Sequence, residues 1–574
     1  MKRTLSISYL VLLLTGFTSC SDYLEILPLN DVVLENYWTE KNDVTSVLNS
    51  CYESLENVES VKRMAIWGEL RSENIVAGRY NTNIELTDAL NETLLPTSSL
   101  TSWSIFYQTI NRCNTVIHYA PSVQEIDPNY TLTEMQATIA EATFIRDLCY
   151  FYLLRTFGEV PMVFQPSISD DIDFEVAPTA AFIIQDGRWE VGPAFDILIN
   201  DLKSVEDMAV RRYFDDTNFD YTNKDSRSKV RENSSRVTRN AIYALLAELN
   251  LWKGDYDETI RYCDLIIDAK KKQYDEKIEK KEMMLFNNIP LVKESVDDNK
   301  TCGNALTDNF GTGNSFESIF ELYFQTENGN NNFVRDYYGY QDQPLGYFAT
   351  PEENRKDVVT SKNTIFSKDD CRAYCTMDKT TTKVSITKYA KSVSVKNPKD
   401  LSDDTGASTF GRRTDNEKPA NWIIYRLTDI LLMKAEALTF KGEENYEQAF
   451  ELVDAVNRRA RNITEAGGAG SLDISKYKSS RQNMMEELIL QERKRELMFE
   501  GKRWYDLVRY SIRVGDNSYL SKQATAKYQI NVNAIQIRLS NLYALFWPFN
   551  KNELKLNRKL KQNPAYGDTE DFQK

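Results

Sequence analysis

The chain contains a single histidine, His118, among its 574 residues. Zinc sites and most general acid–base dyads use imidazole, so one isolated histidine disfavours both kinds of site. The sequence also lacks a G-x-S-x-G nucleophile elbow, a G-x-x-x-x-G-K-[ST] phosphate loop and an H-E-x-x-H pair. We therefore expect a protein that is not an enzyme and that holds neither a cofactor nor a metal ion.

Positive charge is scarce relative to negative charge, because 70 Lys and Arg face 85 Asp and Glu, for a formal net charge of −15. This balance disfavours a nucleic-acid partner, since phosphates attract basic surfaces. Beyond the N-terminus, no run reaches the roughly 18 apolar residues that a transmembrane helix requires. No Pro-, Ser- or Gly-rich linker divides the chain, so we expect a single large domain.

The eight cysteines are widely scattered, and most of them lie within apolar helical patterns. Such an arrangement predicts buried thiols rather than a disulfide framework. Cys371 and Cys375 are close in sequence, but with one histidine in the chain their spacing does not indicate a zinc site.

The first residues predict the compartment of the protein. Lys2 and Arg3 precede an apolar run over residues 5–14, which is typical of a signal peptide and too short to span a membrane. The small residues before Cys20 resemble a bacterial lipobox, in which the cysteine is acylated after cleavage. We expect residues 1–19 to be removed and residues 20–36 to form a lipidated tether that anchors the protein to a membrane. The alternative is an ordinary secretory signal with an incidental cysteine.

Residues 486–510 combine a dense pattern of opposite charges with large apolar side chains. Charges three residues apart share one helical face, and their apolar neighbours predict that some of them are desolvated. Gly501 predicts a bend between two helical segments. The alternative is a solvated amphipathic helix. The expected pairs are Glu492 with Arg495, Glu500 with Arg503, Arg503 with Asp506, and Asp506 with Arg509.

The pattern R-x-x-E-L-x-F-E-G-x-R-x-x-D-L-x-R over residues 493–509 resembles the C-terminal signature of the SusD/RagB family of outer-membrane nutrient-binding lipoproteins. Residues 141–161, with E-A-x-F-x-R and F-G-x-V-P, resemble the N-terminal signature of that family. The resemblance implies that Glu141 and Arg146 are paired charges. We interpret both sets of charges as structural ion pairs that fix helix packing and do not touch the ligand.

Helical periodicity predicts a mainly α fold, with tetratricopeptide-like helical hairpins as a scaffold near residues 103–157, 190–272 and 423–461. A loop-rich insertion over about residues 272–419 carries a few short strands, one of them near residues 317–324. The resemblance implies one SusD-like domain over residues 37–574, in which this insertion contributes to the ligand face. The C-terminal family signature closes that domain at residues 486–566.

Two irregular stretches carry the residues that we expect to contact a ligand. Aromatic side chains are unusually dense there for loops, and such rings can stack on sugars. The alternative is that the rings pack the loops onto the body of the protein. The expected contacts are Trp67, Arg79, Tyr80 and Asn81 in the early stretch, and Tyr337, Tyr338, Tyr340, Gln341 and Phe348 in the late one.

The resemblance implies a surface-exposed protein, lipid-anchored in the outer membrane, that captures a glycan and delivers it to a SusC-like TonB-dependent transporter. Binding of peptides or glycopeptides, as in the RagB branch of the family, is an alternative. A glycoside hydrolase is a less favoured alternative, because two carboxylates a few ångströms apart would suffice and sequence spacing does not reveal such a pair.

Overall fold

The computed structural model describes residues 37–167, 175–214, 232–277, 280, 282–294, 301–302, 304–325, 333–341, 346–354, 365–367, 369–379, 384–392, 399–400, 411–468, 470–477 and 482–567. The predicted signal peptide, Cys20 and the tether lie outside the described residues, so they stay predictions.

Helices make up most of the described chain. In the first half they are α3 (Lys41–Glu56), α4 (Val58–Ala65), α5 (Ile84–Leu90), α6 (Ser104–Ile126), α7 (Leu132–Phe157), α8 (Ala194–Val205), α10 (Glu232–Ser235), α11 (Arg239–Lys253) and α12 (Tyr256–Glu276). In the second half they are α13 (Asn304–Leu306), α14 (Arg372–Cys375), α15 (Leu427–Lys441), α16 (Tyr446–Ala460), α17 (Gln482–Leu497), α18 (Arg503–Val514), α19 (Ser518–Thr525), α20 (Val532–Leu539) and α21 (Lys551–Leu556).

The strands are short and form seven antiparallel pairs within the described residues. The pairs are β1 (Val76–Ala77) with β10 (Phe348–Ala349), β2 (Glu159–Pro161) with β3 (Pro178–Ala180), β4 (Phe182–Gln185) with β5 (Arg188–Val191), β6 (Met283–Phe286) with β7 (Ile289–Val292), β8 (Thr301–Cys302) with β13 (Lys399–Asp400), β9 (Ser318–Leu322) with β14 (Trp422–Arg426), and β11 (Met377–Lys379) with β12 (Val384–Ile386).

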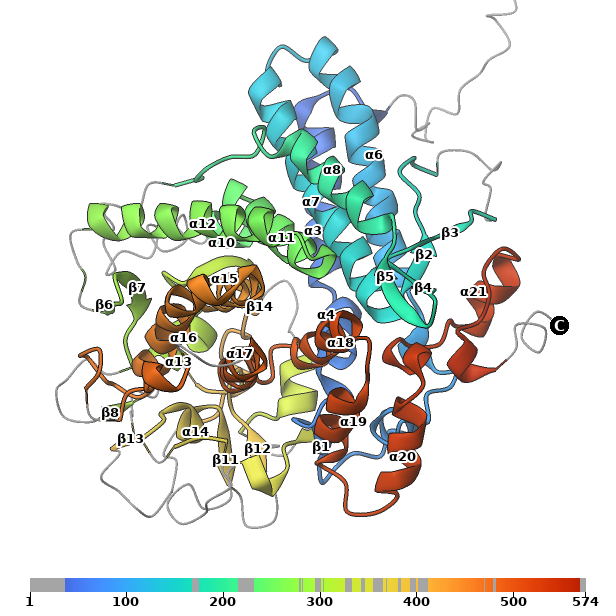
Figure 1. Ribbon diagram of the computed structural model, residues 1–574. Helices are drawn as coiled ribbons and strands as arrows, with labels where there is room; N and C mark the ends of the chain where they lie inside the picture. Colours follow the sequence, from blue (N-terminus) through green and yellow to red (C-terminus); the bar gives the residue numbers. More distant parts are fainter. Residues whose placement is uncertain are drawn as a thin grey trace, which may run out of the picture.

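One helical bundle, at the top of Figure 1, contains α3, α6, α7 and α8. Helix α7 begins at a capping box formed by Thr131 and Glu134, which satisfies two backbone N–H groups at its N-terminus. All of its residues from Ala140 to Phe157 are buried. A helix that is apolar almost all round needs neighbours on several sides, and α3, α6 and α8 provide them.

Two helical hairpins, α11–α12 and α15–α16, lie beside each other because α12 packs on α15. The turn between α11 and α12 contains Gly254, and Asp255 then caps α12 by accepting the N–H of Glu258 at 3.2 Å. Helix α17 packs on α15 and α16. The predicted mainly α fold built from helical hairpins is confirmed.

The strand predicted near residues 317–324 is β9, which is buried at every position. It pairs with β14, which leads directly into α15, so the loop-rich insertion is tied to the third hairpin. The predicted burial of thiols is confirmed where side chains are described, at Cys51, Cys113, Cys149, Cys263, Cys371 and Cys375. Within the described chain, every helix is too short or too polar to cross a membrane.

Candidate functional site

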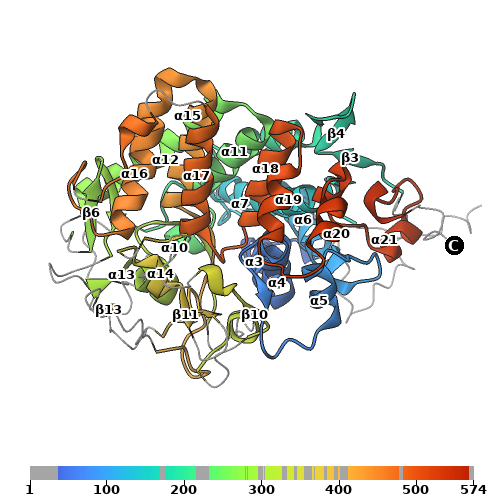
Figure 2. The same cartoon turned by 60° about the horizontal axis from the view of Figure 1, so that its bottom comes forward.

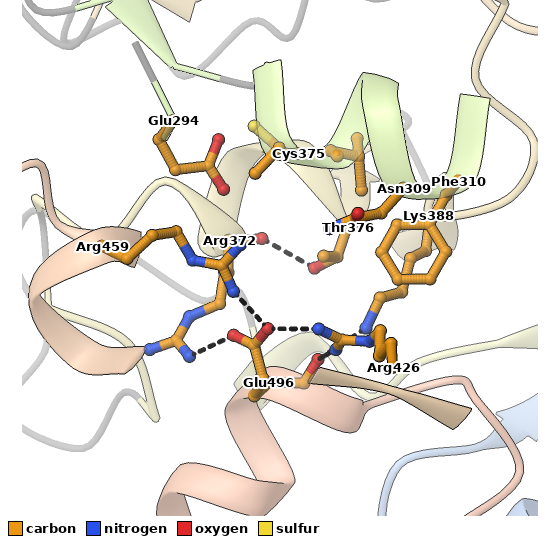
Figure 3. Close-up of a pocket in the computed structure, with 12 residues that line it drawn as sticks. Glu294, Asn309, Phe310, Arg372, Cys375, Thr376, Lys388, Arg426, Arg459 and Glu496 are labelled. Atoms are coloured by element: carbon orange, nitrogen blue, oxygen red, sulfur yellow. Dashed lines mark hydrogen bonds and ion pairs between the residues drawn. The ribbon is translucent and has the colours of Figure 1, made fainter. Parts of the chain in front are cut away.

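A buried ion network lies where α17 ends, and Figure 3 shows its centre. The carboxylate of Glu496 accepts hydrogen bonds from Arg372 at 2.9 Å and from Arg426 at 2.7 Å, and it also pairs with Arg459. All four side chains are buried. The network joins α17 to α14, β14 and α16, so residues far apart in sequence meet at one carboxylate.

Burial alone would raise the pKa of Glu496, but three surrounding guanidinium groups and Lys388 hold that pKa well below its ordinary value. Burial would likewise raise the pKa of Glu492, and Arg372 and Arg495 lower it to about 2. Both carboxylates are therefore ionised at neutral pH and do not act as general acids there. We interpret this network as a packing device rather than as a catalytic centre.

The cavity beside this network is small. It has a volume of about 20 Å³ and is lined by Arg372, Arg426, Arg459, Lys388 and Glu496 among other residues. Such a volume holds a water molecule and is far below what a sugar ring requires. Across the described residues, no group of three or more His, Cys, Asp and Glu side chains is placed to hold a metal ion.

Two of the four ion pairs predicted within residues 486–510 form as expected. Glu492 lies 2.7 Å from Arg495, and Asp506 lies 3.0 Å from Arg509. Both pairs lie within a single helix, α17 or α18. Spacing by three residues places both partners on one helical face only where the helix is continuous between them.

The predicted pairings of Arg503 with Glu500 and with Asp506 are wrong. Arg503 instead donates to Glu73, at 2.8 Å, while Glu500 pairs with Lys388 and Arg426. The helix is interrupted at Gly501, which has a φ of +73°, so Glu500 and Arg503 do not share a helical face. Arg503 and Asp506 both lie on α18, but Asp506 pairs with Arg493 and Arg509 instead. The bend predicted at this glycine is present.

Besides its pair with Arg509, Asp506 accepts from Arg493 at 2.9 Å. Arg493 lies on α17 and Asp506 on α18, so this bond joins the two helices across the bend. Buried Glu69 strengthens the same joint, because its carboxylate accepts the backbone N–H groups of Phe499 and Gly501, each at 3.1 Å.

The predicted pairing of Glu141 with Arg146 is also wrong. Residues five apart on an α-helix point about 140° away from each other, so the two side chains leave α7 in different directions. Glu141 accepts from Tyr52 and Arg236, whereas Arg146 pairs with Asp201. Each charge thus ties α7 to a different neighbouring segment.

Most aromatic residues predicted to contact a ligand are buried in the core. Trp67 is fully buried, and its indole N–H donates to the carbonyl oxygen of Leu100 at 2.9 Å. The hydroxyl of Tyr338 donates to the carbonyl oxygen of Phe499 at 2.8 Å. These rings pack the loops onto the body, which is the alternative given for them above, and their burial leaves no open face for the expected ligand contact. The buried rings are Trp67, Tyr337, Tyr338, Tyr340 and Phe348.

The same structure brings the two predicted loops together, although about 260 residues separate them. Strand β1 pairs with β10, and the N–H of Gly78 donates to the carbonyl oxygen of Tyr347 at 2.7 Å. Figure 2 shows β10 close to α4 and α5, at the edge where the early loop lies. We call residues 78–83 and the described parts of 334–347 the paired loops.

Four side chains of the paired loops form what we call the paired-loop surface: Arg79, Tyr80, Asn81 and Tyr347. The ring of Tyr80 is 48% exposed, and the guanidinium carbon of Arg79 lies 5.9 Å from its centroid. Asn81 and Tyr347 are half-buried. A flat ring beside hydrogen-bond donors suits a sugar, which has apolar C–H faces and hydroxyl groups.

Gln341 is exposed on the late loop, as a ligand contact would require, and its backbone N–H donates to the carbonyl oxygen of Arg413 at 2.8 Å. Tyr347 was not among the predicted contacts. Gly346 is the sequence feature that could have indicated Tyr347 as a contact. A glycine before an aromatic residue lets another backbone segment approach closely.

Two family models match the chain. One, described as "SusD family", matches residues 316–566, and the other, described as "Starch-binding associating with outer membrane", matches residues 22–251. SusD-like protein P38 of Formosa agariphila is 24% identical over 98% of this chain and 99% of its own length. SusD-like protein P2 of the same organism is 25% identical over 88% of this chain and 90% of its own length.

Solved structures share the fold. A SusD superfamily protein from Bacteroides thetaiotaomicron has a TM-score of 0.60 at 19% identity, covering 92% of this chain and 99% of its own. Surface glycan-binding protein A from Bacteroides thetaiotaomicron has a TM-score of 0.57 at 16% identity, covering 92% of this chain and all of its own. With family matches over most of the chain and relatives similar over nearly its whole length, this chain belongs to the SusD/RagB family.

Proposed function

We propose that this protein binds a glycan at the outer membrane and delivers it to a SusC-like TonB-dependent transporter. The observation that carries the proposal is the paired-loop surface, where exposed Tyr80 lies beside Arg79 on a loop held by β1 and β10. The ring offers a stacking face, and the guanidinium and amide groups offer donors for hydroxyl oxygens. The matching family of starch-binding proteins that associate with the outer membrane, and the structural neighbour surface glycan-binding protein A, support the same ligand class.

A binding array of polysaccharides and peptides tests this proposal, combined with an assay for new reducing ends. We expect at least one polysaccharide to bind, without cleavage. Binding of peptides alone would favour the RagB-like alternative. The release of reducing ends would favour a glycoside hydrolase, and either result would contradict the proposed function.

Tyr80→Ala should weaken binding of that polysaccharide about fivefold, because a well-placed aromatic contact is worth about 1 kcal/mol. The ring is exposed, so its removal leaves the core unchanged. Titration calorimetry measures the affinity, and circular dichroism checks the fold. Tyr80→Phe keeps the stacking face and should bind nearly as well as the unmodified protein. Equal affinity of Tyr80→Ala and the unmodified protein would show that this ring is not a contact.

The anchoring part of the proposal concerns Cys20. If acyl chains on this cysteine hold the protein on the outer membrane, Cys20→Ala should move it from the membrane fraction to the soluble fraction, because the methylenes that bind the bilayer are lost. Cell fractionation with labelled fatty acid measures both the location and the acylation. Ser19→Ala, which keeps the cysteine, is the matched control. Retention of Cys20→Ala in the membrane fraction would contradict lipid anchoring at this residue.

A further inference from the structure

The exposed aromatic area of the paired loops is small. Phe333 and Tyr337 stack in the core with ring centroids 4.6 Å apart, and Tyr338 and Phe348 are buried beside them. Among the described residues of these loops, Tyr80 and half-buried Tyr347 are the rings that solvent can reach. A neutral sugar chain gains much of its contact area from such rings. The paired-loop surface therefore offers a neutral glycan little to stack on.

Arg79 offers a different kind of contact. Its side chain is exposed beside Tyr80, and among the residues that the structure describes no carboxylate pairs with it. Arg335 on the late loop differs, because it already forms an ion pair with Asp415 at 2.8 Å. A guanidinium without an internal partner keeps its planar set of donors for an external anion.

The backbone that carries Arg79 is held on both sides. The N–H of Gly78 donates to Tyr347, and the N–H of Asn81 donates back to the carbonyl oxygen of Gly78 at 3.2 Å. These bonds close a turn with Arg79 and Tyr80 at its outer positions. Ring and guanidinium thus stay adjacent before a ligand arrives, and little ordering of the loop is required on binding.

We infer that the ligand is an acidic glycan, whose uronate carboxylate or sulfate ester binds Arg79 while a sugar ring stacks on Tyr80. This inference rests on the proposed glycan-binding function and specifies the charge of the ligand. Both anions fit the forked geometry of arginine. The chain has a net charge of −15, so a polyanion gains no general attraction, and a preference for it has to come from a local contact.

Matched polymers separate charge from sugar identity. The mature protein is titrated with polygalacturonate and its carboxyl-reduced product, and with iota-carrageenan and its desulfated product. We expect the charged member of at least one pair to bind about tenfold more tightly than its neutral counterpart, with a smaller advantage in about 0.5 M NaCl. The first pair tests a carboxylate and the second a sulfate.

Equal binding of charged and neutral members, or a preference for neutral ones, would overturn the acidic class and leave the glycan-binding proposal intact. Failure of all four polymers to bind, with a neutral polysaccharide of the array bound, would overturn the acidic class alone, whereas failure of every polysaccharide in the array would overturn both. The two proposals therefore fail in distinguishable ways.

Arg79→Gln should weaken binding of the charged polymer about tenfold and leave binding of the neutral one unchanged, because one charge-assisted bidentate contact is lost. Arg79→Lys keeps the positive charge but loses the planar pair of donors. Its affinity for the charged polymer should therefore lie between those of Arg79→Gln and the unmodified protein. Arg188→Gln is the matched control, since it removes the same charge from exposed β5, away from the paired loops. Equal weakening by Arg79→Gln and Arg188→Gln would indicate a general charge effect and overturn the inference.

Discussion

Replacing Glu496 with glutamine should lower the free energy of unfolding by about 3–5 kcal/mol, because it removes one charge from a buried and mutually paired set. Glutamine has nearly the same shape as glutamate, so the substitution leaves the volume of the cavity beside the network unchanged. Its amide supplies one acceptor where three buried arginines now share two carboxylate oxygens. The loss is therefore electrostatic rather than steric.

The other partners of those arginines set the size of the effect. Arg372 also pairs with Asp370, at 2.8 Å, and Arg426 also pairs with Glu500, at 2.7 Å. These carboxylates remain in the variant, as does Glu317 beside Arg459, so each guanidinium keeps at least one counter-charge. We therefore expect a loss toward the lower end of the range, near 3 kcal/mol.

Chemical denaturation measures the change as a shift of the unfolding midpoint. The matched control is Glu134→Gln, because the ion pair of Glu134 with Lys41 is 43% and 39% exposed at its two side chains. Glutamine also preserves the capping box of α7, so this control should change stability by less than about 1 kcal/mol. If both variants unfold at the same denaturant concentration, the network around Glu496 contributes no more than a surface ion pair.

The helices were predictable from the sequence because the signals for them are local. The apolar periodicity of α7, the Gly-Asp turn before α12 and the strong pattern of α15 each involve residues within a few turns of one another. The ion pair of Glu492 with Arg495 was predictable for the same reason.

The partners of Glu496 were not predictable, because Arg372 lies 124 residues away along the chain and Arg426 lies 70 residues away. Spacing within a helix carries no information about contacts at such separations. Gly501 correctly predicts a bend, and this bend is also the reason that Glu500 does not pair with Arg503.

The candidate ligand contacts were only partly predictable, because composition does not separate exposed rings from packed ones. Tyr80 and Tyr338 both lie in irregular, aromatic stretches, but one is 48% exposed and the other is fully buried. Burial depends on what the rest of the chain places over each ring, and Tyr338 is covered by rings that include Tyr389 and Phe499.

Gly78→Ala should weaken glycan binding by up to about 30-fold, the largest effect on function that we expect. A β-carbon at position 78 would lie 2.0 Å from the carbonyl oxygen of Gly346 and 2.8 Å from the carbonyl carbon of Tyr347. Both atoms belong to the backbone, which cannot relieve the clash by rotating as a side chain could. The paired loops therefore have to separate. Overpacking of this kind costs about 2 kcal/mol, and destabilising the binding-competent paired state by that amount lowers the apparent affinity by at most about 30-fold.

The effect of Gly78→Ala should be local, because the helical hairpins do not depend on the paired loops for their packing. Affinity for the polysaccharide that the unmodified protein binds should fall, while the helical circular dichroism signal stays unchanged. Gly187→Ala is the control, since a β-carbon there meets no atom within 4 Å and its φ of +76° costs only about 1 kcal/mol. If Gly78→Ala binds as tightly as Gly187→Ala, the ligand does not require the paired loops, and the site lies elsewhere on the protein.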